Sequence, residues 1–140
     1  MGYKKILIDA NVCLDVTIMR HPFYKASAKL FEAIESKLYV GVLSADSLTN
    51  IFYVTKKLTN KEVAFKQLKL LYKLLEIGTV DSSTIEMALS SGWGDFEDAI
   101  QFFCGLEHSC DAIITRNEKD FGKSTLPIYT PEKFVLNYLT

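Results

Sequence analysis

Short apolar runs alternate with longer amphipathic segments along the whole chain. Each run is three or four residues long, largely apolar and bounded by polar positions, a pattern typical of the buried strands of a parallel sheet. The runs cover residues 6–8, 39–42, 77–80, 112–114 and 127–129, and the last is expected to form an edge strand. Five strands are therefore predicted, none adjacent in sequence to the next.

The segments between the runs repeat their apolar positions at helical spacing. In residues 61–76, for example, Ala64, Leu68, Leu71 and Leu75 fall on one face. Pro131 suits the first turn of a last helix. Helices are predicted from near Asn11, over residues 24–36, 44–58, 61–76 and 83–90, from residue 95 onward, and over 131–138.

Strands that alternate with helices predict an α/β fold of three layers, α/β/α, with a central and mainly parallel sheet of four or five strands. The chain has 140 residues and shows no repeat or linker, so we expect one domain spanning residues 1–140. In such folds the ligand crevice lies at the carboxyl ends of the strands. Functional residues are therefore expected just after strands.

Composition narrows the classes of protein that fit. Hydrophobic residues make up 49% of the chain and aromatic residues 12%, which argues against disorder. Lys and Arg number 16 against 17 Asp and Glu, so the net charge of −1 provides no global field that would hold a polyanion. Contact with a nucleic acid must therefore be local or mediated by a metal ion.

The cellular compartment is indicated by the cysteines and by the start of the chain. Cys13, Cys104 and Cys110 form an odd set without a CxxC pair, which is typical of reduced thiols in the cytoplasm. Only three apolar residues precede Asp9 in the first run, too few for a signal peptide or a membrane span. We expect a cytoplasmic protein without membrane association.

Several other kinds of site find little support. The chain contains no GxxxxGK phosphate loop and no GxGxxG fingerprint. His21 and His108 have no partner at metal-ligand spacing. Six lysines gather in residues 56–73, where they form either a solvated face or a contact for an RNA backbone: Lys56, Lys57, Lys61, Lys66, Lys69 and Lys73.

Acidic and amide side chains recur where the predicted strands meet their helices. Asp9 follows the first strand, Asn50 lies on the helix after the second, Asp98 on the helix before the fourth, and Thr115 and Asn117 directly after the fourth. Converging oxygens of this kind suit Mg²⁺ or Mn²⁺. Without a cation, two carboxylates about 4 Å apart repel each other by roughly 4 kcal/mol at an effective dielectric constant near 20.

Each of these residues also has a purely structural explanation. Asp9 and Asn11 are good caps for the first helix. Asp95 is a good N-cap for its own helix, with Asp98 at the third position, where the helix dipole favours an acid. Asn117 is suited to a turn with positive φ. Taken one at a time, the residues leave both interpretations open.

Three longer stretches change this balance. They read LIDANVCLD, SADSLTNIFYV and DFEDAIQFFCGLEHSCDAIITRNEKDF. Together they resemble the motifs of the PIN domain family, the nuclease fold of VapC-type bacterial toxins, and the last stretch is the most specific. The resemblance runs through the whole chain and implies a PIN-like fold.

The resemblance also implies a role for each matching residue. Asp9 and Asp98 match metal-binding acids, Asn117 matches a fourth position that carries Asp or Asn, and Thr115 matches a hydroxyl residue near the site. Two further residues match acidic positions that are common in this subgroup, Asp95 and Asp120.

One position departs from the family pattern. Active members carry a glutamate where this chain has Asn50, which keeps an oxygen ligand but loses a negative charge, so metal affinity is expected to fall. Asp46 lies four residues earlier on the same predicted helix face, where it either supplies a carboxylate or serves as a favourable acid in the first turn. We expect one well-held metal ion and a second that arrives with substrate.

The function that the resemblance implies is metal-dependent hydrolysis of RNA, carried out by an endoribonuclease that is the toxin-like component of a toxin–antitoxin pair. Family analogy adds an antitoxin protein and a homodimer as partners beside the RNA substrate. The alternative is a catalytically weakened PIN-fold module that acts in RNA or protein binding. A third possibility is a structural protein that uses its acids only as helix caps.

Overall fold

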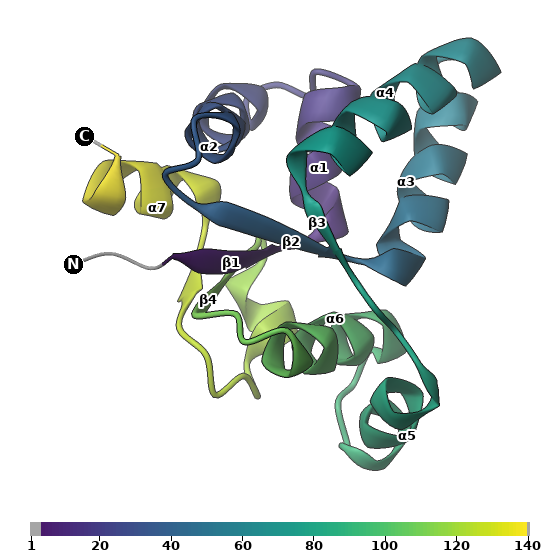
Figure 1. Ribbon diagram of the computed structural model, residues 1–140, viewed down its shortest axis with the longest axis vertical. Coiled ribbons are helices and arrows are strands. Elements are labelled where there is room, and N and C mark those ends of the chain that lie inside the picture. The colour runs from purple at the N-terminus through teal and green to yellow at the C-terminus, as the bar shows by residue number, and fades with distance from the viewer. Residues whose placement is uncertain (1–3, 140) are drawn as a thin grey trace.

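The computed structural model describes residues 4–139, and residues 1–3 and 140 lie outside the described part. Five strands form one sheet in the order β3-β2-β1-β4-β5, and every neighbouring pair is parallel (Figure 1). The strands are β1 (Lys5–Ile8), β2 (Val40–Ser44), β3 (Glu76–Gly78), β4 (Ala112–Ile114) and β5 (Ile128–Tyr129). All five predicted strands are confirmed, and β5 is an edge strand as expected.

The helices are also confirmed, with small shifts at their ends. They are α1 (Ala10–Thr17), α2 (Tyr24–Glu35), α3 (Ala45–Leu58), α4 (Lys61–Leu74), α5 (Ser82–Ser90), α6 (Phe96–Glu107) and α7 (Pro131–Tyr138). A short 3₁₀ helix that was not predicted, η1 (Glu118–Phe121), lies between β4 and β5. The strand predicted at residues 77–80 begins one residue earlier and ends at Gly78. It begins earlier because α4 ends at Leu74 and the backbone of Leu75 is already extended.

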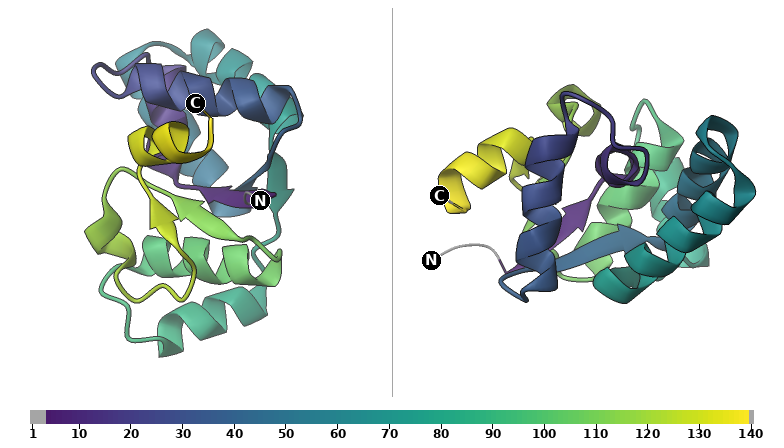
Figure 2. Two further views of the ribbon diagram at one scale, coloured as in Figure 1. Left: turned by 90° about the vertical axis from the view of Figure 1, so that its left-hand side faces the viewer. Right: turned by 90° about the horizontal axis from the view of Figure 1, so that it is seen from above.

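Alternate residues of the strands pack on opposite faces of the sheet. Ile6 and Ile8 face a core shared with α1, α2, α3, α4 and α7, whereas Leu7, Val42 and Ile113 face α6 and η1. Figures 1 and 2 show α5 and α6 on one side of the sheet and the other five helices on the opposite side. The prediction of a three-layer α/β/α fold with a parallel sheet is confirmed.

All five strands end at the same edge of the sheet, since every pair is parallel. Ile8 of β1 lies opposite Ile114 of β4, so Asp9 and Thr115 are the next residues on two neighbouring strands. The Asp9 N–H donates to the Ile114 carbonyl at 3.0 Å and continues the ladder past the end of β1. The topology thus places two predicted site residues side by side.

The close approach of α6 to the sheet can be tested at Gly78. A Cβ atom there would lie 2.5 Å from Cys104 Sγ and 3.2 Å from Val42 Cγ1, so Gly78→Ala should lower the free energy of unfolding by about 1–3 kcal/mol through overpacking. Gly94→Ala is the matched control, because nothing lies within 4 Å of its Cβ position. Urea unfolding of the two variants measures the difference, and equal stabilities would contradict this packing.

Candidate metal site at the carboxyl edge of the sheet

Asp9 is buried at the end of β1, with 5% of its surface exposed. It occupies the N-cap position of α1 but makes no capping hydrogen bond with its side chain. Instead, Thr115 Oγ1 donates to Asp9 Oδ2 at 2.8 Å. The Asp9 carboxylate is therefore oriented from the neighbouring strand.

Thr115 connects Asp9 to Asn117. The fully buried Thr115 hydroxyl oxygen also accepts from the Asn117 N–H at 3.2 Å. Asn117 has φ −119° and ψ 90°, so the positive-φ turn considered for it is not formed, and its side chain does not cap η1. The amide side chain of Asn117 is exposed beside the Asp9–Thr115 pair.

The start of α6 brings Asp98 to the same place. Asp95 is the N-cap of this helix and accepts from the Asp98 N–H at 2.9 Å, as predicted. One turn after Asp98, the buried Gln101 accepts from the Ala10 N–H at 3.3 Å through its Oε1. This bond joins α6, which carries Asp98, to the first residue of α1, which follows Asp9.

Burial and neighbouring negative charges raise the pKa values of both acids. The pKa of Asp98 rises to about 7, first because of burial and then because of the negative charges of Asp95, Asp9 and Asp120. Burial raises the pKa of Asp9, hydrogen bonds from Thr115 and Gln101 oppose that effect, and Asp120 adds to it. Burial outweighs the hydrogen bonds to Asp9, and a bound cation would stabilise the charged forms of both acids.

Asp46 and Asn50 line a cavity of about 370 Å³ next to Asp9. The shared helix face predicted for this pair is confirmed. One carboxylate oxygen of Asp46, Oδ1, is buried without a hydrogen-bond partner. The complete lining is Ala10, Asp46, Ser47, Thr49, Asn50, Tyr53, Glu97 and Gln101.

Sequence reasoning missed two residues of this region, Glu97 and Gln101. Both lie on α6, and their spacing of four residues places them on one helix face toward the cavity. That spacing was a usable signal, because Glu97 directly precedes Asp98 and Gln101 follows it by one turn. Glu97 is a further carboxylate beside Asn50, the position that lacks the family's glutamate.

The donor set is incomplete as a preformed metal cluster. Within residues 4–139, no group of three or more His, Cys, Asp or Glu side chains is arranged to hold a metal ion. Two carboxylates, Asp9 and Asp98, are coupled by their charges, and the remaining oxygens come from amides and hydroxyls. Such oxygens fit Mg²⁺ or Mn²⁺. Asn11 is exposed in the first turn of α1.

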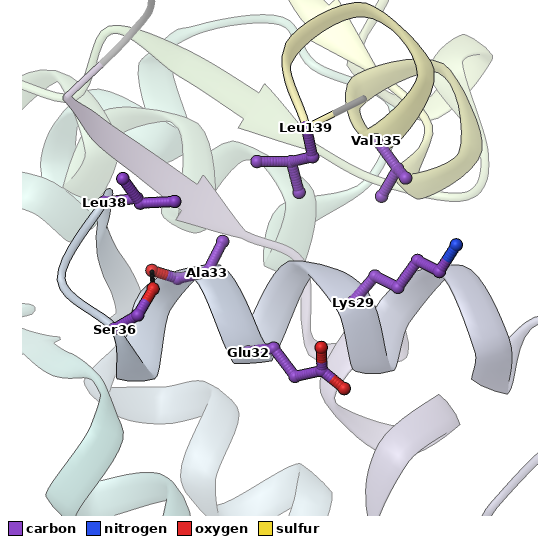
Figure 3. A pocket seen from close by; sticks show the side chains of 7 residues that line it. All are labelled: Lys29, Glu32, Ala33, Ser36, Leu38, Val135 and Leu139. Atoms are coloured by element: carbon purple, nitrogen blue, oxygen red, sulfur yellow. Dashed lines mark hydrogen bonds between the residues drawn. The ribbon is translucent and has the colours of Figure 1, made fainter.

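Another hollow, of about 480 Å³, lies between α2 and α7 and contains none of the candidate residues (Figure 3). Its lining includes Leu38, Val135 and Leu139 and two charged side chains, Lys29 and Glu32.

His108 has a structural role, since its Nε2 accepts from the Thr79 N–H at 3.1 Å. None of the helices within residues 4–139 is long and apolar enough to cross a membrane.

A parallel α/β sheet with acids at its carboxyl edge defines a class of proteins that bind a ligand there. A family model for the PIN domain matches residues 5–119, and the chain belongs to the PIN domain family. Ribonuclease VapC1 of Aquifex aeolicus (strain VF5) is 25% identical over 139 residues, which cover 96% of this chain and 95% of that protein.

Solved structures share the fold. VapC20 of Mycobacterium tuberculosis, a sarcin-ricin loop cleaving toxin, superposes with a TM-score of 0.69 at 12% identity, over 84% of this chain and 94% of that chain. DNA-bound VapBC from Salmonella typhimurium superposes with a TM-score of 0.68 at 16% identity, over 91% and 98% of the two chains. At these identities the likeness extends to the fold alone.

The raised pKa of Asp98 predicts a dependence of stability on pH. Since the folded state binds this proton more tightly than the unfolded state, stability is lost as pH rises from about 4 to about 7, and the loss is complete above 7. Asp98→Asn should therefore raise the melting temperature at pH 8 by roughly 2–5 °C. At pH 4 the gain should vanish.

Asp81 provides a control of opposite sign. Backbone and side-chain hydrogen bonds from Thr84 lower its pKa, so its charge stabilises the fold above about pH 4. Asp81→Ala should lower the melting temperature at pH 8. Calorimetric scans of both variants across this pH range provide the measurement, and a lower melting temperature of Asp98→Asn at pH 8 would contradict the electrostatic account.

Proposed function

We propose that this protein is a metal-dependent endoribonuclease that hydrolyses phosphodiester bonds of RNA, the toxin-like component of a toxin–antitoxin pair. The observation that carries the proposal is the pair Asp9 and Asp98 at the carboxyl edge of the sheet, where burial raises both pKa values and the charge of Asp9 raises that of Asp98 further. The PIN family model and the similarity to a ribonuclease over 139 residues support it.

In this proposal Asp9, Asp98 and Asn117 hold one Mg²⁺ or Mn²⁺ ion. When bound, the ion supplies an activated water and neutralises charge on the scissile phosphate. Thr115 fixes the orientation of the Asp9 carboxylate, and Asp95 fixes the first turn of α6 through the Asp98 N–H. The supporting residues are Asn50, Asp46, Asp120 and Asn11.

The neighbouring cavity is the proposed place for a nucleotide of the RNA. Tyr53 lines it with 58% of its surface exposed. An exposed ring offers a stacking surface for a base, and the Asn50 amide offers a donor and an acceptor. The low net charge is consistent with binding that is local to this edge.

The proposed protein partner is an antitoxin. Similar solved structures include VapBC2 from Rickettsia felis bound to a promoter DNA fragment and a toxin–antitoxin complex from Klebsiella pneumoniae, with TM-scores of 0.65 and 0.66. A homodimer stays a prediction from family analogy.

The second candidate function is a weakened PIN-fold module that binds RNA or protein. Asn50 favours it, because a neutral amide stands where active members carry a glutamate. The incomplete acid cluster within residues 4–139 points the same way. The two functions differ in whether the purified protein cuts RNA.

Isosteric replacement of the acids tests catalysis directly. Asp9→Asn and Asp98→Asn keep the shape of each side chain but remove the charge that holds the cation, so cleavage of a mixed RNA pool with Mn²⁺ should fall at least about 100-fold. Glu86→Gln, at an exposed acid on α5, should leave the rate unchanged. Cleavage that persists in both site variants would sink the proposed mechanism.

Restoring the family's charge at residue 50 provides a test in the direction of gain. Asn50→Glu adds a carboxylate to the cavity beside Asp9, and Mn²⁺ affinity should rise about tenfold, a gain of about 1.4 kcal/mol. Thr49→Glu adds the same charge one residue away and should gain less. Calorimetric titration measures both, and equal affinities would show that general charge, not position 50, controls binding.

A further inference from the structure

Asp15 is a fully buried carboxylate on α1, outside the candidate metal site. Arg116 Nε lies 3.0 Å from its Oδ2, and Arg20 Nη1 lies 3.8 Å from its Oδ1. The Arg116 guanidinium carbon also lies 4.1 Å from the centroid of the Phe23 ring. The Arg116 side chain therefore contacts both Asp15 of α1 and Phe23, the residue that precedes α2.

Arg116 is the residue between Thr115 and Asn117. The Thr115 hydroxyl donates to Asp9, and its oxygen accepts from the Asn117 N–H. The residues on both sides of Arg116 are thus linked to each other, and Thr115 is linked to Asp9. Because the Arg116 side chain is anchored, the peptide groups on both sides of it are restrained. An anchor at residue 116 is thus placed to restrain the two neighbouring residues relative to Asp9, in addition to the bond from the Thr115 N–H to the Tyr129 carbonyl at 2.9 Å.

Stability alone does not account for this ion pair. Both Asp15 oxygens and Arg116 Nε lack an aligned hydrogen bond, although the charges are close. Buried pairs with such geometry often contribute nothing net, and neutral replacements of similar size can be more stable. Residues of this kind next to a site are expected to orient the groups that bind the ligand.

We propose that Asp15 and Arg116 form a positioning pair, in which Asp15 holds Arg116 so that Thr115 and Asn117 are fixed against Asp9. This inference rests on the proposed function and deepens it, because it extends control of the metal site to a residue that cannot touch RNA or metal. Asp15 acts on the site through Arg116, and Arg116 acts through the backbone of Thr115 and Asn117.

The experiment compares Asp15→Asn, Arg116→Gln and the double variant. Arg116→Gln leaves the buried Asp15 with only the longer contact to Arg20, and Asp15→Asn removes the charge that faces Arg116, so both should lose melting temperature. The double variant removes both charges of the close pair and should regain most of it. The matched control is Lys133→Ala, which breaks the exposed 3.0 Å ion pair with Glu118 in the same loop region.

Mn²⁺ affinity and the kcat of RNA cleavage separate positioning from stability. All three variants should lose about 10–100-fold in both quantities, including the double variant whose melting temperature recovers. Lys133→Ala should change neither. A double variant that binds Mn²⁺ and cleaves like the wild type would overturn the inference, as would loss in Arg116→Gln without loss in Asp15→Asn, which would assign Arg116 a direct contact with RNA.

Hydrogen exchange of the Asn117 amide supplies a readout that does not need activity. Its N–H is bonded to Thr115 Oγ1 in the folded protein, and exchange should speed up at least about tenfold in the double variant. If the wild type neither binds Mn²⁺ nor cleaves RNA, the proposed function fails, and this exchange rate alone decides the inference. Unchanged exchange would overturn it.

Discussion

The site depends on two carboxylates that are held close together in a place where burial disfavours their charge. Asp9 follows β1 and Asp98 lies on α6; burial raises the pKa of both, and the charge of Asp9 raises the pKa of Asp98 further. Proteins retain such an arrangement against the tendency of the acids to separate or become neutral. In the proposed function a cation would turn this unfavourable pair into a binding site.

The fold enforces the constraint with few interactions. The parallel pairing of β1 with β4 places Thr115 beside Asp9, and the bond from the Ala10 N–H to Gln101 brings the start of α6 to the start of α1. The buried Asp15 then ties α1 to the residue that separates Thr115 from Asn117. Strand register and buried polar contacts thus determine where the side chains of the site lie.

The sequence alone was enough for the architecture and for the residues that directly follow strands. Strand length and apolar character predict β1 and β4, and a parallel sheet then requires Asp9 and Thr115 to share an edge. Gln101, Glu97 and the Asp15–Arg116 pair were not predicted, because each depends on how one helix is rotated against a distant one. The start of β3 was also missed, since local periodicity continues past the true end of α4.

The proposed function requires a divalent ion bound between Asp9 and Asp98. Anomalous diffraction from crystals soaked in Mn²⁺ tests it most directly, because the signal locates the ion without reference to activity. The account predicts one strong peak within coordination distance of both carboxylates and of the Asn117 side chain. A peak elsewhere, or none in crystals soaked at millimolar Mn²⁺, would contradict it.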